Sequence, residues 1–234
     1  MIETKPGMKP HGGARAGFRE LVETIMLALF IFLLVRSSLQ NFKVEGHSMD
    51  PTLANGEFIL VNKLIYQSID LGPLDAILPF VEFEDDTRFI LRGPRRGDIV
   101  VFVPPINPDS DFIKRVIGEP GEVIEIRRGR VYIDGMLLDE PYIQNRDPSN
   151  YPACLIPDDH FFVMGDNRPN SSDSRRQDFG PIHADRIVGL TSVIYWPAGH
   201  VGWAPNRDPE LIEPDVQGPA RRVTDAADCG INDD

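Results

Sequence analysis

The sequence predicts a mainly β protein, in which antiparallel sheets form a compact β-barrel-like core with a small β-hairpin subdomain, preceded by one N-terminal transmembrane helix. Two observations support this fold class. A single long apolar run lies near the start of the 234-residue chain. Beyond Gln40 the chain consists of short runs rich in β-branched and aromatic residues, separated by Gly, Pro, Asn and Asp, which is the pattern of strands and turns.

The first 39 residues predict a flexible cytoplasmic leader over 1–19 and a transmembrane anchor over 20–39. The leader is rich in Gly, Pro, Lys and Arg and has no apolar periodicity. The run "TIMLALFIFLLV", residues 24–35, carries no charge, and with its flanking turns it approaches the roughly 20 residues that cross a bilayer. A cleaved signal peptide and a buried helix of a soluble domain are the competing interpretations.

The charges around this run predict its orientation. Only Arg36 and Lys43 follow it closely, whereas four basic residues precede it, namely Lys5, Lys9, Arg15 and Arg19. The positive-inside rule therefore predicts a single-pass protein, with its N-terminus in the cytoplasm and the domain over 40–203 on the outer face of the membrane. The lipid bilayer is thus an expected partner.

Residues 40–203 form the predicted β-rich domain, with strand-like runs such as "EFILVNKLIY", "GDIVVFVP", "DFIKRVIG" and "HFFVMGD". The run "EVIEIRRGRVYID" predicts a hairpin that turns at Arg128-Gly129, and residues 119–160 are expected to form a small hairpin subdomain. Residues 70–96 predict an irregular excursion. Residues 204–234 are acidic and contain few large apolar side chains, which predicts a disordered tail.

Composition argues against two classes of function. With 36 acidic and 24 basic side chains the net charge is −12, so the chain as a whole repels a nucleic-acid backbone and no nucleic-acid partner is expected. Cys154 and Cys229 lack CxxC spacing, so neither a metal site nor a cofactor is indicated. The two cysteines form a disulfide if their Cα atoms approach in an oxidising compartment, which their spacing leaves open.

The segment "VEGHSMDPTL", residues 44–53, contains the candidate nucleophile Ser48, which needs a base to accept its proton. His47 is adjacent, but neighbouring side chains of an extended segment point to opposite faces. The GxSxG pattern is absent, because Asp50 stands in place of the second glycine. A lysine serves as the base instead if burial lowers its pKa.

Two lysines compete for that role. In "DFIKRVIG" the alternation of a strand puts Lys114 on the same face as Phe112 and Val116, where a buried residue is expected. Most strand lysines only protect an exposed edge, which is the ordinary interpretation of Lys114. Lys63, in "LVNKLIY", has a similar apolar neighbourhood and is the alternative candidate.

A third stretch, "MGDNRPNSSDSRRQDFGPI" over residues 164–182, concentrates Asp, Asn, Arg and Ser between apolar strands. Such a composition most often forms a surface loop held by local hydrogen bonds. Its density also suggests a supporting network, in which Ser171 and Asp173 beside Arg175 fix a lysine amine and balance Arg115.

In chain order, "GHSMDPTL", "RRGDIVVF", "IKRVIGEPGE" and "GDNRPNSSDSR" follow an N-terminal hydrophobic segment. Over residues 42–196 this order resembles the boxes of the bacterial type I signal peptidases. The resemblance implies a membrane-anchored serine endopeptidase that removes signal peptides from exported preproteins after small residues. It implies that Ser48 is the nucleophile and that Lys114 is the general base.

The resemblance also implies supporting roles. Ser171 is expected to hydrogen-bond the Lys114 amine, Asp173 to pair with Arg115 and Arg175, and Met49 to pack in the substrate pockets. Some family members assist the oxyanion hole with a serine two residues before the nucleophile, but Gly46 occupies that position here. The Ser48 backbone N–H is therefore the expected donor, with Gly46 as a second candidate.

Two other functions compete with this interpretation. One is a catalytically inactive, membrane-tethered β module, which the joint presence of Ser48, Lys114, Ser171 and Asp173 argues against. The other is a self-cleaving Ser-Lys protease similar to the autoproteolytic repressors. A repressor needs a helical DNA-binding domain, whereas residues 1–40 offer only a basic segment and one apolar helix.

Overall fold

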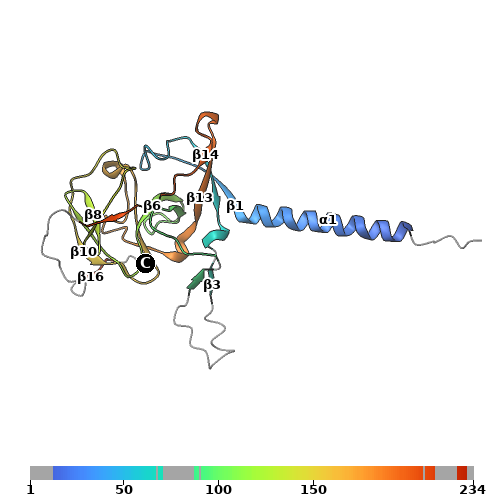
Figure 1. Ribbon diagram of the computed structural model, residues 1–234, viewed down its shortest axis with the longest axis horizontal. Helices are drawn as coiled ribbons and strands as arrows, with labels where there is room; N and C mark the ends of the chain where they lie inside the picture. The colour runs from blue at the N-terminus through green and yellow to red at the C-terminus, as the bar shows by residue number, and fades with distance from the viewer. Residues whose placement is uncertain are drawn as a thin grey trace, which may run out of the picture. The chain divides into compact units, whose positions relative to one another are not determined.

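The computed structural model describes residues 13–66, 68–70, 87–89, 91–207, 209–213 and 226–230 (Figure 1). The chain divides into two compact units, one ending at Ser38 and the other beginning at Leu39. In the first unit the described residues form one helix. The second unit is built from β-sheets, which confirms the predicted mainly β fold.

Helix α1 spans Gly13–Ser38. It begins inside the predicted leader, of which residues 1–12 lie outside the described part of the chain. Arg19 and Glu23 pair across one turn of this helix at 2.6 Å. The N-terminal helix was therefore predicted correctly, although its start was not.

The prediction that this helix spans a membrane over 20–39 is not supported. Among the described residues, no helix is both long enough and apolar enough to cross a bilayer.

The larger sheet of the second unit has, within the described residues, eight strands in the order β1-β2-β13-β5-β6-β11-β12, with β14 beside β13. Every pair of adjacent strands in this sheet is antiparallel. The sheet curls into a half-barrel whose edges are β1 and β12, rather than a closed barrel (Figure 1). Its strands are β1 Leu39–Lys43, β2 Phe58–Asn62, β5 Ile99–Phe102, β6 Phe112–Gly118, β11 His160–Met164, β12 Ile182–His183, β13 Ile187–Trp196 and β14 Gly202–Trp203.

A second sheet has, in the described part of the chain, six strands in the order β15-β9-β8-β7-β10-β16. Four of them come from the segment 119–160 that we expected to form a hairpin subdomain. The other two, β15 and β16, come from the tail. The strands are β7 Val123–Arg127, β8 Arg130–Ile133, β9 Met136–Leu138, β10 Tyr151–Leu155, β15 Leu211–Ile212 and β16 Ala227–Asp228.

The tail over 204–234 was predicted to be disordered, and this is wrong for its described residues. A disulfide joins Cys229 to Cys154 in β10, and β16 pairs parallel with β10. At the opposite edge of the sheet, β15 pairs with β9. Both edges of the second sheet are therefore covered by tail strands, which are held by the disulfide, by main-chain pairing and by the apolar contacts of Leu211 and Cys229.

Short elements complete the described chain. Strand β3 (Ser68–Asp70) ends at the first residue of the predicted irregular excursion over 70–96 and pairs with β4 (Thr87–Phe89) inside it; most of the excursion lies outside the described residues. The 3-10 turns are η1 Leu64–Tyr66, η2 Arg168–Asn170, η3 Ala184–Arg186 and η4 Ala198–His200.

Strand β6 lies between β5 and β11 and is buried on both faces. Val116 belongs to one apolar cluster of the core, with Phe102, Val163 and Phe179, and Ile117 belongs to another, with Ile124, Ile133 and Phe162. A polar side chain on this strand is therefore shielded from water. Lys114 and Arg115 are the two charged residues of β6.

Candidate active site

Ser48 lies in the turn that joins β1 to β2. The base of this turn is closed by two main-chain hydrogen bonds of 2.8 Å, from Val44 N–H to Glu57 O and from Gly56 N–H to Val44 O. Beneath Ser48, Met49 and Leu53 are buried in an apolar cluster of the core. Met49 therefore anchors the turn and does not line the cavity beside Ser48, contrary to our expectation that it packs in the substrate pockets.

Gly46 has a backbone φ of +91°, a conformation that favours glycine over residues with a side chain. An added Cβ would meet nothing within 4 Å, so the constraint comes from the backbone and not from space. The Gly46 N–H donates to Asn55 Oδ1 at 3.1 Å. Gly46 is thus engaged elsewhere and is not the second oxyanion donor that we considered.

His47 does not contact the Ser48 hydroxyl. Its Nδ1 lies 2.8 Å from Asp50 Oδ2, and its side chain is 65% exposed. His47 is therefore directed away from the Ser48 hydroxyl, although by its contact with Asp50 within a turn and not by the alternation of an extended segment.

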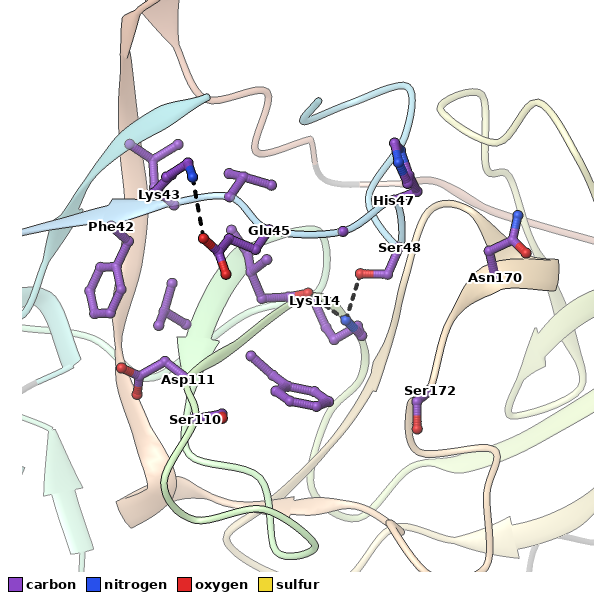
Figure 2. A pocket seen from close by; sticks show the side chains of 16 residues that line it. Phe42, Lys43, Glu45, His47, Ser48, Ser110, Asp111, Lys114, Asn170 and Ser172 are labelled. Carbon is purple, nitrogen blue, oxygen red and sulfur yellow. Dashed lines mark hydrogen bonds and ion pairs between the residues drawn. The ribbon is translucent and has the colours of Figure 1, made fainter. Parts of the chain in front are cut away.

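The side-chain amine of Lys114 points toward the hydroxyl of Ser48 (Figure 2). Its Nζ lies 2.8 Å from Ser48 Oγ and donates to Ile113 O at 2.8 Å. The side chain is only 3% exposed and lies over the Phe112 ring, with 5.3 Å between Nζ and the ring centre. The competing Lys63 is exposed.

Burial lowers the pKa of Lys114 from 10.5 to about 8. The carboxylates of Asp173 and Asp166 act in the opposite direction and raise it, but desolvation is the larger effect. A substantial fraction of Lys114 is thus neutral in mildly alkaline solution, and a neutral amine can accept the proton of Ser48.

A cavity of about 610 Å³ opens onto this pair. Its walls are formed by the end of β1 and the nucleophile turn on one side and by the start of β6 on the other (Figure 2). The apolar part of the lining consists of Phe42, Val44, Ile59, Val101, Phe112 and Ile113. Asn170 and Ser172 of the predicted polar loop also reach it.

Arg115 pairs with Asp166 and not with Asp173, which corrects our expectation. The two side chains are fully buried and joined by two hydrogen bonds, from Nε to Oδ1 at 3.0 Å and from Nη2 to Oδ2 at 2.8 Å. The hydroxyl of Thr52, in the nucleophile turn, donates to the same Asp166 carboxylate. Asp166 therefore connects strand β6, which carries Lys114, to the turn that carries Ser48.

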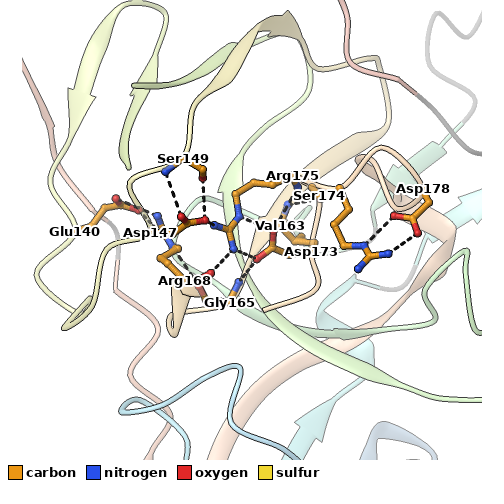
Figure 3. A network of polar contacts seen from close by, with 11 residues as sticks. Glu140, Asp147, Ser149, Val163, Gly165, Arg168, Asp173, Ser174, Arg175 and Asp178 are labelled. Carbon is orange, nitrogen blue, oxygen red and sulfur yellow. Dashed lines mark hydrogen bonds and ion pairs between the residues drawn. The ribbon is translucent and has the colours of Figure 1, made fainter. Parts of the chain in front are cut away.

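Asp173 pairs with Arg175, as expected. Arg175 Nε and Nη2 donate to its two carboxylate oxygens at 2.8 and 2.9 Å (Figure 3). Arg175 also donates to Arg168 O at 2.7 Å and to Asp147 at 3.0 Å. The predicted polar loop is therefore held as one connected network beside the site.

The expected hydrogen bond between Ser171 and Lys114 is not formed. Ser171 Oγ is buried and has no hydrogen-bond partner among the described residues. It packs over Gly165, where an added Cβ would lie 2.3 Å from Ser171 Oγ and 2.5 Å from Ser48 O. Ser171 thus lies beside the nucleophile turn, and Gly165 permits the close approach.

Three residues that sequence reasoning missed support this arrangement. Besides Asp166, they are Glu140, which pairs with the buried Arg168, and Asn167, which donates to the carbonyls of His47 and Ser48. Asp166, Asn167 and Arg168 belong to the polar stretch that we singled out, but its composition does not reveal which carboxylate faces Arg115. Glu140 follows β9 of the second sheet, and no motif or pattern in the sequence around it indicates a role in the site.

The described residues include no group of three or more His, Cys, Asp or Glu side chains arranged to hold a metal ion. The chemistry that the site supports is acyl transfer by a serine activated by a lysine.

Comparison with known proteins finds similar sequences over most of this chain. The family model "Signal peptidase, peptidase S26" matches residues 18–196. A probable signal peptidase I-2 of Synechocystis is 32% identical over 189 residues, which are 78% of this chain and 75% of the relative. A signal peptidase I of Bacillus caldolyticus is 35% identical over 185 residues, 73% of this chain and 83% of the relative. A crystal structure of a signal peptidase I from Enterococcus faecalis, 31% identical, aligns with a TM-score of 0.38, covering 43% of this chain and 98% of that one.

Proposed function

Because the chain belongs to the signal peptidase family, peptidase S26, we propose that it is an endopeptidase that removes N-terminal signal peptides from exported preproteins. Ser48 is the nucleophile and Lys114 is the general base. The observation that carries the proposal is the approach of the buried Lys114 Nζ to Ser48 Oγ, 2.8 Å, at the end of an open cavity.

In the acylation step, neutral Lys114 accepts the hydroxyl proton while Ser48 Oγ attacks the carbonyl carbon of the scissile peptide bond. The negative charge that develops on the carbonyl oxygen is stabilised by the Ser48 backbone N–H. Lys114, now an ammonium, donates its proton to the leaving amine as the carbon–nitrogen bond breaks. The products of this step are the free mature protein and a signal peptide esterified to Ser48.

In the deacylation step, Lys114 removes a proton from a water molecule, and the resulting nucleophile attacks the ester. Return of that proton to Ser48 Oγ releases the signal peptide as a carboxylic acid. One lysine thus serves as base and as acid in both steps, which requires a pKa near the working pH. The lowered pKa of Lys114, about 8, supports this role.

The cavity supports a preference for small residues before the cut. Phe112 and Val44 both contribute apolar surface to the cavity that Ser48 and Lys114 line, so that a methyl side chain has apolar contacts there. We infer that the peptidase acts at the outer face of the cytoplasmic membrane, where exported preproteins present their cleavage sites.

Cleavage of a preprotein with an Ala-x-Ala site by the detergent-treated full chain tests the proposal. The N-terminus of the product, determined by mass spectrometry, is expected to begin directly after the second Ala. A matched preprotein with Trp in place of that Ala is expected to resist cleavage. A folded protein that cleaves neither substrate, or that cleaves both equally, would contradict the proposed specificity; the first result would favour an inactive β module.

A further inference from the structure

Stabilisation of the oxyanion depends on the orientation of one peptide unit. Because Gly46 has no hydroxyl and its N–H is bonded to Asn55, the Ser48 N–H is the donor left near the nucleophile. Among the hydrogen bonds of the described residues, none is donated by this N–H. A donor that must stabilise developing charge works best when its direction is fixed before the reaction.

The Ser48 N–H and the His47 carbonyl belong to the same peptide unit. This unit is trans, because the cis bonds found in the described chain are Asp50–Pro51 and Trp196–Pro197. In a planar trans peptide the C=O and N–H point in opposite directions. A contact that fixes the His47 oxygen therefore also fixes the direction of the Ser48 N–H.

Asn167 makes that contact and a second one. Its side-chain Nδ2 donates to His47 O at 2.8 Å, and its main-chain N–H donates to Ser48 O at 3.0 Å. A main-chain hydrogen bond to His47 O, from the Asp50 N–H, is longer at 3.4 Å. One residue thus holds the peptide units on both sides of Ser48, and these two units define its φ and ψ.

Asn167 is itself held in place from both directions. The preceding Asp166 is locked by the buried pair with Arg115, and Gly165 lets the loop approach the Ser48 carbonyl closely. Asn167 Oδ1 accepts from Asn170 Nδ2 at 3.4 Å, which directs the amide NH₂ group toward His47. The loop after β11 therefore reaches the nucleophile turn with a fixed side chain.

We propose that Asn167 is a positioning residue, which orients the Ser48 amide as the oxyanion donor by holding the carbonyls of His47 and Ser48. This inference rests on the proposed peptidase function. It concerns the transition state rather than substrate binding, because both contacts lie on the main chain of the nucleophile turn. Substitution of Asn167 should therefore lower kcat with little change in KM.

The test compares Asn167→Ala with wild type on an Ala-x-Ala preprotein, with folding checked by circular dichroism. The expected result is a kcat roughly 10- to 100-fold lower, with KM within about threefold of wild type and the same pH midpoint. The inhibition constant of an Ala-x-Ala peptide aldehyde, which adds Ser48 Oγ to form a tetrahedral adduct, should rise by the same factor as kcat/KM falls. Asn150→Ala, which removes an exposed Asn that accepts from Arg128 N–H, is the matched control and should retain wild-type kinetics.

If Asn167→Ala does not fold, Asn167→Leu, which keeps the side-chain volume and lacks the N–H donors, is used in its place with the same expectation. A kcat within twofold of wild type in the folded variant would overturn the inference. A loss confined to KM, with unchanged aldehyde affinity, would overturn it as well. Wild type that cleaves no preprotein would instead overturn the proposed function together with this inference, so the two failures are distinguishable.

Discussion

Lys114 Nζ lies 2.8 Å from Ser48 Oγ, although the two residues are 66 positions apart in the sequence. The hydroxyl comes from a turn at the edge of the large sheet and the amine from its buried strand β6. Because Lys114 is 3% exposed, its ammonium form has lost most of its hydration. Burial therefore favours the neutral form of the Lys114 amine, and in that form the amine can accept a proton from Ser48.

Activity should depend on the ionisation of Lys114. Since only the neutral amine accepts the Ser48 proton and its pKa is lowered to about 8, kcat/KM should rise with pH and level off above this value. Lys114→Arg should be inactive at every pH, because a guanidinium stays protonated. Initial rates on a peptide substrate between pH 6 and 10 check both statements. A rate independent of pH across this range would contradict the role of Lys114 as base.

The burial of Lys114 should reduce the stability of the fold. Its folded pKa, about 8, lies below its ordinary value of 10.5, so between these pH values the unfolded chain binds more protons. Stability should therefore rise with pH across that window, and the full cost of burying the charge is present below it. Lys114→Met should be more stable than wild type at pH 7 by about 1–3 kcal/mol, with the gain fading as the pH rises from about 8 to 10.5.

Urea unfolding at pH 7 and pH 10 measures this difference. Lys63→Met, which replaces an exposed lysine, is the matched control and should leave the unfolding midpoint unchanged. Equal stability of wild type and Lys114→Met at pH 7 would mean that the lysine is hydrated in the folded protein.

The buried pair of Arg115 and Asp166 should be strongly coupled to folding. Asp166→Asn leaves the Arg115 guanidinium, which is 0% exposed, without its counter-charge. Breaking such a pair from one side costs about 3–5 kcal/mol. Chemical denaturation checks this, with Asp178→Asn as the control, since the Asp178–Arg176 pair is exposed and should contribute nothing measurable. Similar small effects in both variants would show that Arg115 is hydrated or paired elsewhere.

The disulfide should stabilise the second sheet without serving the chemistry. Cys154 and Cys229 are 75 positions apart, and closing a loop of this length in the unfolded chain contributes about 4 kcal/mol in the entropic description. The double variant Cys154→Ser, Cys229→Ser should lose about this much stability in denaturant unfolding. Its kcat/KM at 25 °C should match wild type, because the dyad lies on the other sheet. Equal unfolding midpoints with and without the disulfide would indicate that the tail strands hold the sheet by themselves.

Local patterns were sufficient to predict much of this fold. Period-two alternation placed Lys114 on the buried face of a strand, and the Arg128-Gly129 turn between β7 and β8 followed from residue type. The tail was mispredicted because its two short strands are held by partners far away in sequence. The pairing of Cys229 with Cys154 depends on a distance that no local pattern contains.

The sequence indicated which residues belong to the site better than it indicated which of them pair with one another. Both Asp166 and Asp173 lie in the polar stretch, and the choice of partner for Arg115 depends on strand register. In the structure Met164 lies opposite Arg115, so Asp166, two residues further on, falls beside the guanidinium. Register is a long-range property, and for the same reason Asn167 could not be assigned to the nucleophile turn from sequence.

The most direct test of the Ser-Lys dyad is the rate of preprotein cleavage by wild type, Ser48→Ala and Lys114→Ala, each shown to be folded by circular dichroism. Ser149→Ala and Lys63→Ala, at exposed positions, serve as matched controls. Both dyad variants are expected to lose cleavage while both controls retain the wild-type rate. Cleavage at the wild-type rate by folded Ser48→Ala or Lys114→Ala would contradict the dyad.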